Sequence, residues 1–109
     1  MELKNATTAL AALGQPTRLS VFRLLVEAGP EGRMPGEIAE ALSLPGATLS
    51  FHLKELHRAG LLASRQEGRS IIYMARFETM NALLGYLTEN CCCGAPCSPV
   101  SSCSVATES

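Results

Sequence analysis

Five cysteines lie close together near the carboxyl end of this chain, and they are the residues best suited to chemistry. They fall within a span of thirteen residues in a chain of 109, at Cys91, Cys92, Cys93, Cys97 and Cys103. Adjacent thiolates can hold one ion at little cost in loop-closure entropy, and thiolate ligands select soft ions. We therefore expect Cys91, Cys92 and Cys97 to bind one soft ion, with Cys93 and Cys103 as alternative ligands.

Other uses of these thiols stay open. Four thiolates suit a tetrahedral Zn²⁺ or Cd²⁺ site, although the usual paired C-x-x-C spacing is missing. Neighbouring thiols can also form a disulfide, so the cluster could respond to oxidants or persulfides. A cluster without function is the weakest interpretation, because exposed thiols are reactive.

A second candidate site is the amphipathic segment 47–60, ATLSFHLKELHRAG. At helical period it places Leu49, Leu53 and Leu56 on one apolar stripe, and Gly60 is suited to end the helix. The opposite side and its flanks carry cations and hydrogen-bonding groups. A short amphipathic helix more often simply packs on a core, so the neighbouring segments decide its interpretation.

The residues before this segment complete a helix-turn-helix pattern. Segment 35–42 has an apolar face and begins with Pro35, and segment 43–46 contains a Pro-Gly turn. The predicted arrangement is two short helices joined by a tight turn, and the second helix has a polar outer face. This arrangement places a recognition helix in the DNA major groove.

After this helix the pattern changes to that of strands. Segments 61–65 and 70–75 are separated by a turn that contains Gly68, and the second is rich in β-branched and aromatic residues. This predicts a β-hairpin with Arg65 and Arg69 on or near its tip. A hairpin directly after a recognition helix is typical of a wing.

Charge is distributed unevenly along the chain. The formal net charge is −1, yet segment 47–76 carries +3 and both histidines, while the rest of the chain carries −4. Because local charge matters more than net charge for an anionic partner, this asymmetry favours an anion-binding face on the predicted helix and hairpin.

The remaining segments predict a single, mainly helical domain. Segments 3–13, 16–27 and 77–89 have helical patterns, which gives the order α-α-α-α-β-β-α with one small hairpin. The first and last helices offer more apolar surface than one monomer covers, so we expect a homodimer through them. We expect residues 1–89 to form the folded domain and residues 90–109 a flexible cysteine-rich tail.

Nothing in the sequence indicates export or a membrane partner. Residues 1–20 lack a basic start followed by a long apolar run. A membrane span needs about 20 apolar residues, far more than any run found near the start of the chain. We expect a cytoplasmic protein, in which clustered cysteines more often serve metal or redox chemistry than structural disulfides.

The order of these elements resembles the arsenic-repressor (ArsR/SmtB) family of winged-helix metal and metalloid sensors. The motifs that carry the resemblance are ALGQPTRL at 12–19, EIAEAL at 37–42, LSFHL at 49–53, LHRAGLL at 56–62 and RQEGR at 65–69, followed by Tyr73. The resemblance implies a homodimeric winged helix-turn-helix repressor that binds double-stranded operator DNA and leaves it when an inducer binds.

The resemblance also implies which residues meet the duplex. It assigns the groove-facing positions of the second helix to Thr48, Ser50, Phe51, His52 and Lys54. It assigns the wing contacts to Arg65 and Arg69. Arg58 lies on the same polar side of the helix, and we include it among the DNA-binding residues.

One departure from the family shifts attention to the tail. Many members hold arsenite with cysteines just before and within the helix at 35–42, where this chain has Met34-Pro35-Gly36-Glu37. The family's His and carboxylate sites on the last helix also look absent, because segment 77–89 has Glu78 and Glu89 but no His or Asp. We therefore expect As(III) or Sb(III), bound by the carboxyl-terminal thiolates, to be the inducer.

Two alternatives to this prediction remain. A repressor of the same fold could respond to zinc, cadmium or thiol oxidation, or the winged helix could bind a protein while the tail carries metal. We expect no enzymatic activity and no organic cofactor. His52 and His57 are five residues apart and do not share a helix face, and no Ser-His-acid set or phosphate-cradling loop is found.

Overall fold

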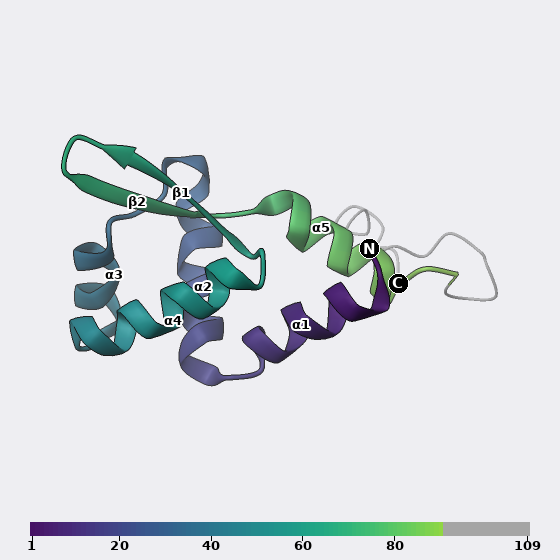
Figure 1. Ribbon diagram of the computed structural model, residues 1–109. Coiled ribbons are helices and arrows are strands. Elements are labelled where there is room, and N and C mark those ends of the chain that lie inside the picture. Colours follow the sequence, from purple (N-terminus) through teal and green to yellow (C-terminus); the bar gives the residue numbers. More distant parts are fainter. Residues whose placement is uncertain (91–109) are drawn as a thin grey trace, which may run out of the picture.

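Four helices come first in the chain, and a two-stranded hairpin and a last helix follow (Figure 1). The computed structural model describes residues 1–90; residues 91–109, which include all five cysteines, lie outside the described residues. The elements are α1 (Leu3–Leu13), α2 (Pro16–Ala28), the 3₁₀ turn η1 (Gly29–Glu31), α3 (Pro35–Leu42), α4 (Gly46–Arg58), β1 (Leu62–Glu67), β2 (Ser70–Ala75) and α5 (Phe77–Leu87). The predicted winged helix-turn-helix order is confirmed.

The core is aliphatic and centres on α2. Val21, Phe22 and Leu25 of this helix are buried, and they form one cluster with buried residues of every other α-helix. From α4 the cluster receives the predicted stripe of Leu49, Leu53 and Leu56. Full burial of one such side chain stabilises the fold by about 1.5–3 kcal/mol, so this stripe fixes which side of α4 remains in solvent.

Helix α1 packs against the core mainly through small side chains. The buried residues are Ala6, Ala9 and Ala12, whereas Leu3 is 66% exposed and Leu10 is 43% exposed. Alanine side chains let α1 lie close to α2 and α4. The leucines are therefore left on the outside of the monomer.

A short turn joins α3 to α4. Ser43 takes the left-handed conformation, with φ 55°, and the Leu44 N–H donates to the Ala39 carbonyl at 2.9 Å. Helix α4 begins at Gly46, directly after Pro45. At its other end Gly60 has φ +82°, which confirms that a glycine follows the helix where a positive φ is needed.

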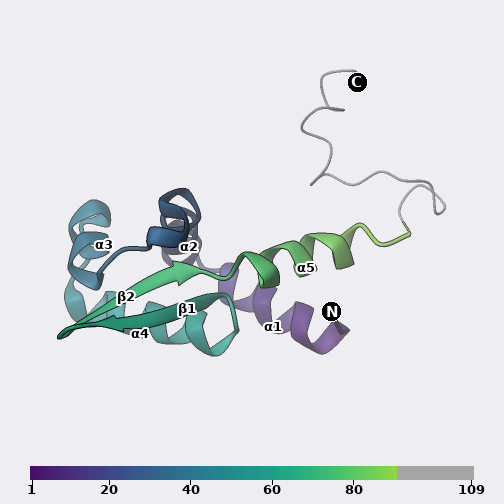
Figure 2. The same cartoon turned by 90° about the horizontal axis from the view of Figure 1, so that it is seen from above.

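Strands β1 and β2 pair antiparallel, from Leu62 opposite Ala75 to Glu67 opposite Ser70. Strand β1 continues two residues beyond its predicted end, so the connection is the tight turn that contains Gly68. The hairpin lies over α4 and projects away from the helical core (Figures 1 and 2).

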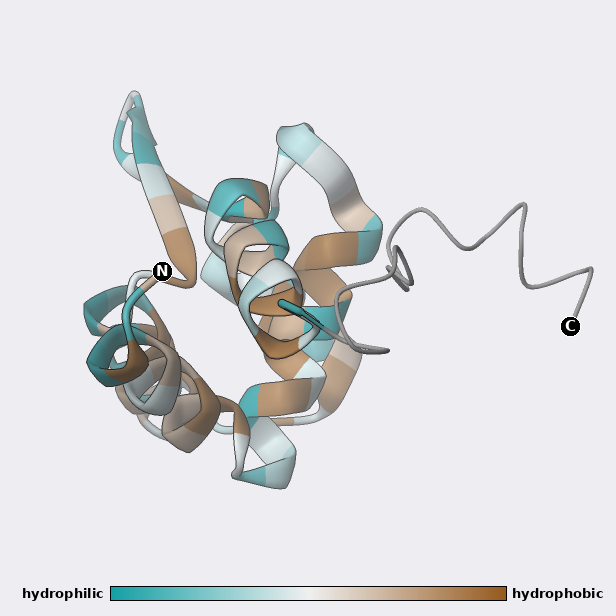
Figure 3. Ribbon diagram, turned by 90° about the vertical axis from the view of Figure 1, so that its right-hand side faces the viewer, coloured by the Kyte–Doolittle hydropathy of each residue, from teal (hydrophilic) through white to brown (hydrophobic). Residues whose placement is uncertain are grey.

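Helices α1 and α5 lie side by side at the end of the molecule opposite the tip of the hairpin (Figures 1 and 2). Figure 3 looks at this end and shows hydrophobic residues on both helices. Leu87 at the end of α5 is 54% exposed. Among the described residues, no helix has the length and apolar character that crossing a membrane requires.

Candidate nucleic-acid interface

The solvent side of α4 carries most of the predicted groove-facing residues. Thr48, Ser50, Phe51, Lys54 and Arg58 are all exposed, and the Phe51 side chain is 56% exposed. Arg58 pairs with the Glu55 carboxylate at 3.1 Å on the helix surface. An exposed phenylalanine between hydroxyl and ammonium groups is suited to a partner with both apolar and anionic parts, as a DNA groove has.

The prediction that His52 faces a groove is wrong. Its side chain is buried, with only 8% of the residue exposed, because position 52 lies three residues after Leu49 and four before Leu56, on the packed side of the helix. Its Nδ1 is buried and finds no hydrogen-bond partner among residues 1–90. Burial, and secondarily the nearby Arg18 guanidinium, lowers the pKa of His52 below its ordinary value of 6.5.

This lowered pKa predicts a loss of stability in acid. The unfolded chain takes up the proton near pH 6.5 while the folded chain still resists it, so the free energy of unfolding falls as the pH drops from about 6.5 toward the lower folded pKa. We expect His52→Leu to remove this part of the pH dependence and to leave DNA affinity at neutral pH unchanged. Urea unfolding at several pH values and duplex binding test both points; weakened binding by a folded variant would contradict the buried position.

The arginines of the hairpin differ in their surroundings. Arg69 is exposed in the turn region, as predicted. Arg65 stands farther back, opposite Ile72, and its guanidinium donates to the Pro30 and Glu31 carbonyls at 3.1 and 3.0 Å and to the Glu67 carboxylate. Arg65 therefore ties β1 to η1, and its role as a DNA contact stays a prediction.

A second connection fixes the base of the hairpin. Arg33 and Tyr73 exchange two backbone hydrogen bonds of 2.9 Å, so a residue of the loop between η1 and α3 adds a short bridge to β2. Gly32 makes this approach feasible. It has φ +69°, and a Cβ there would collide with the Tyr73 carbonyl oxygen and the Ile72 side chain. The hairpin is thus held to the α2–α3 connection by main chain as well as by Arg65.

Gly32→Ala is expected to destabilise the domain by about 1–3 kcal/mol or more, because it forces a positive φ on alanine and a steric conflict with backbone. Gly36→Ala is the matched control. Gly36 lies in α3 with open space around its Cβ position, so alanine there should stabilise the helix by up to about 1 kcal/mol. Opposite shifts of the urea midpoint are expected; equal shifts would contradict the role given to the Gly32 bridge.

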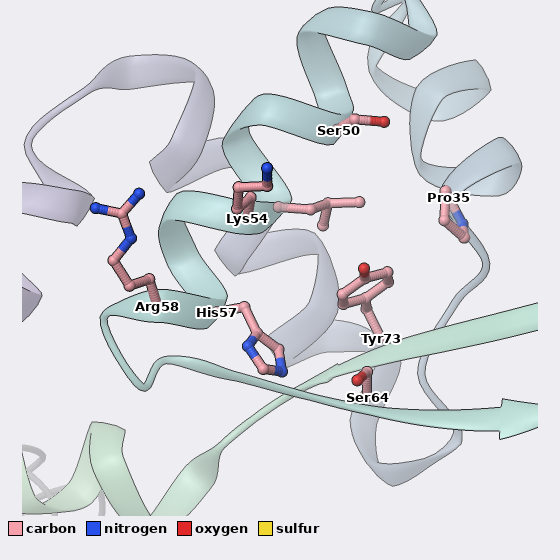
Figure 4. A pocket seen from close by; sticks show the side chains of 8 residues that line it. Pro35, Ser50, Lys54, His57, Arg58, Ser64 and Tyr73 are labelled. Carbon is pink, nitrogen blue, oxygen red and sulfur yellow. The ribbon is translucent and has the colours of Figure 1, made fainter.

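An open cleft of about 590 Å³ separates the exposed side of α4 from the hairpin (Figure 4). It is lined by Pro35, Ser50, Leu53, Lys54, His57, Arg58, Ser64 and Tyr73. The His57 and Tyr73 rings meet edge to face, with centroids 6.5 Å apart. None of the described residues that line this cleft is a carboxylate, so its polar character is that of hydrogen-bond donors and cations.

Sequence reasoning did not assign His57, Ser64 or Tyr73 to the interface. Ser64 and Tyr73 are direct cross-strand partners and therefore lie on the same face of the hairpin. Once the turn is placed at Gly68, this pairing follows from the register. The contact of Tyr73 with His57 depends on how the hairpin lies over α4, and the sequence contains no local signal for it.

The described part of the chain contains no group of three His, Cys, Asp or Glu side chains able to hold a metal ion. The predicted ligands Cys91, Cys92 and Cys97, and the alternatives Cys93 and Cys103, all lie outside the described residues. Their role therefore stays a prediction. Within residues 1–90, the geometry supports a surface for an anionic polymer.

Comparison with known proteins agrees with this geometry. A helix-turn-helix domain family matches residues 13–65. The regulator YceK of Bacillus subtilis is 35% identical over 70% of this chain and 76% of its own length. YgaV of Escherichia coli is 28% identical over 82% of this chain and 88% of its own. The repressor SmtB of Mycobacterium tuberculosis is 34% identical over 65% of this chain and half of its own. All three are named as helix-turn-helix-type transcriptional proteins, which points away from an enzyme.

Solved structures show the same arrangement. An ArsR-like transcriptional regulator from Rhodococcus sp. RHA1 superposes with a TM-score of 0.69 and 25% identity, over 80% of this chain and 78% of that one. A structure described as a possible transcriptional regulator for arsenical resistance superposes with a TM-score of 0.64 and 27% identity, over 75% of this chain and 81% of that one. The homodimeric winged helix-turn-helix DNA-binding domain Mb0332 of Mycobacterium bovis superposes with a TM-score of 0.65 and 26% identity, over 81% of this chain and 82% of that one. From its fold, its exposed recognition helix and these relatives, the chain belongs to the helix-turn-helix-type transcriptional regulators, and its winged helix-turn-helix domain is similar to those of ArsR-family proteins.

Proposed function

We propose that this protein is a homodimeric repressor that binds operator DNA through α4 and the hairpin, and that As(III) or Sb(III) releases it by binding Cys91, Cys92 and Cys97. The observation that carries the DNA-binding part is the polar, cationic outer side of α4, which stands beside a hairpin with Arg69 at its turn. Such a helix fits the major groove, and the hairpin then lies over the adjoining backbone and groove.

Two of the four predicted DNA-binding cations on α4 and the hairpin are available to the phosphate backbone. Lys54 and Arg69 are exposed and, within residues 1–90, neither forms an ion pair. Arg23, Arg33, Arg58 and Arg65 each pair with a glutamate. Unpaired cations can release counterions from DNA without first losing a protein partner, so Lys54 and Arg69 should dominate the salt dependence of binding.

Dimerisation is supported by the outer surface of α1 and α5. Leu3 and Leu10 are seven residues apart and so share one side of α1, and both are exposed in the monomer, as is Leu87 on α5. Burying these side chains against a second copy would remove apolar surface from water. A two-fold pair of α4 helices matches two half-sites of a duplex.

The metalloid part rests on the sequence of the tail. All five cysteines follow Asn90, and three thiolates suit a soft trivalent ion. One structural relative is described as a possible regulator for arsenical resistance. The thiols begin four residues after Leu87, the end of α5, so a bound ion would act on the helix that we place at the dimer interface. Coupling of this kind is typically ~1–3 kcal/mol.

The experiment is a ligand titration of the protein–DNA complex. The operator duplex is selected by the protein from random-sequence DNA, and release is followed by fluorescence anisotropy with As(III), Sb(III), Zn²⁺, Cd²⁺ and an oxidant. We expect As(III) and Sb(III) to release the full chain and not a chain truncated after Asn90. Release of the truncated chain by As(III) would refute the assignment to the tail. Release by Zn²⁺, Cd²⁺ or oxidant alone would replace the metalloid with that inducer.

A further inference from the structure

We infer that the cleft between α4 and the hairpin is the seat of one phosphodiester group of the bound DNA strand, and that the Tyr73 hydroxyl is one of its ligands. This inference rests on the DNA-binding part of the proposed function and deepens it. It assigns Tyr73, together with Ser50 and Ser64, to the contact that sets how deeply the duplex sits. Phosphate contacts fix register and orientation without reading sequence.

The position of the cleft follows from the two elements that border it. A helix in the major groove and a wing over the adjoining groove stand on opposite sides of one sugar–phosphate strand. That strand must then pass between α4 and the hairpin. The cleft lies between them and opens to solvent there, lined from α4 by Ser50, Lys54 and His57 and from the hairpin by Ser64 and Tyr73 (Figure 4).

The chemistry of the lining suits an anion. Its polar side chains are three hydroxyls, an imidazole, an ammonium and a guanidinium, and none is a carboxylate. Within residues 1–90, the hydroxyls of Ser50, Ser64 and Tyr73 have no hydrogen-bond partner, and Lys54 has no ion-pair partner. A phosphodiester oxygen accepts such donors and carries the charge that attracts Lys54.

Tyr73 is held in place better than the other donors. Its backbone is bound to Arg33 by two hydrogen bonds of 2.9 Å, and its ring meets the His57 ring edge to face. In Figure 4 its hydroxyl points from the hairpin toward α4, into the space that the Lys54 and Ser50 side chains border. A rigid donor loses little entropy on binding, whereas the lysine must be ordered. The tyrosine is therefore suited to fix one phosphate at a defined distance from α4.

The test compares Tyr73→Phe with the wild-type chain on the duplex that the protein selects. Phenylalanine keeps the ring and its contact with His57 and removes only the hydroxyl. Because a hydrogen bond to a charged group is worth more than a neutral one, we expect binding to weaken about tenfold. The loss should be equal on an unrelated duplex. The slope of log Kd against log salt should stay unchanged, whereas Lys54→Ala should lower it by about one.

A matched control is available, because the chain has only two tyrosines. Tyr86→Phe makes the same chemical change away from the cleft, at a side chain that packs against the monomer core and is not among the exposed residues assigned to the dimer surface, and should bind DNA like the wild type. Duplexes with a single neutral methylphosphonate then locate the contact. One position should weaken the wild type by a larger factor than it weakens Tyr73→Phe, in which Lys54 and the two serines still contact that phosphate.

Four outcomes would overturn parts of the two proposals in different ways. Equal binding by Tyr73→Phe and wild type on every duplex refutes the phosphate seat. A loss confined to one base sequence also refutes it, because a phosphate contact carries no sequence information. Absence of saturable duplex binding by the wild-type chain refutes the DNA-binding part of the proposed function itself. Failure of As(III) to release the complex refutes only the assignment of the inducer and does not affect the proposed phosphate contact.

Discussion

Replacing Leu10 by glutamate is expected to convert the proposed dimer into a monomer and to weaken operator binding by a factor on the order of 10²–10⁴. Leu10 is 43% exposed on the outer side of α1, next to α5, and its side chain is not part of the monomer core. A charge placed there would be desolvated in a dimer and hydrated in a monomer. In a monomer, a single recognition helix has to bind alone. In a dimer, binding of one half-site holds the second recognition helix at a high effective concentration near the other half-site.

Leu19→Glu is the matched control for this variant. Leu19 is 42% exposed, but it lies on α2 and not on either of the two helices proposed to form the interface, so the same charge should leave both oligomeric state and affinity unchanged. Sedimentation across a range of protein concentrations gives the oligomeric state, and circular dichroism confirms folding. A dimeric Leu10→Glu chain with normal affinity would contradict an interface through α1.

The helices could be predicted almost in full because their apolar residues recur at helical spacing. The stripe of Leu49, Leu53 and Leu56 predicted which side of α4 is buried, and the structure confirms it. Periodicity could not predict the packing of α1. It shows which residues share a side of the helix, but not which neighbour that side meets. The small side chains of Ala6 and Ala9 pack in the core, whereas Leu3 and Leu10 are exposed.

The candidate site was less predictable because it depends on long-range contacts. His52 could have been placed correctly, since it lies three and four residues from buried leucines. The bonds of Arg65 to the η1 carbonyls join residues 35 and 34 positions apart, and no local pattern reports them. The same is true of Tyr73, whose place beside α4 depends on its bridge to Arg33 and on Gly32.

Serine at both Cys91 and Cys92 is expected to leave operator affinity unchanged and to abolish release by As(III). These residues lie beyond Asn90 and outside the elements that we assign to DNA and to the dimer, so the free protein should bind as before. Serine keeps nearly the size of cysteine but supplies no thiolate, and a soft trivalent ion then loses two of its three proposed ligands. Wild-type affinity should fall about 5–150-fold on saturation with As(III), the range of typical allosteric coupling.

Cys103→Ser is the matched control, because it makes the same substitution at the cysteine farthest from α5. If Cys91, Cys92 and Cys97 form the site, this control should respond to As(III) like the wild type, and Cys97→Ser should not. Anisotropy titrations of the four proteins, each fully reduced, compare them directly. A ligand changes DNA affinity only if it binds the DNA-binding conformation and the released conformation of the protein with different affinities. Retained release by the double variant would therefore mean that As(III) acts through other groups. Loss of release in Cys103→Ser would extend the ligand set to the end of the cysteine cluster.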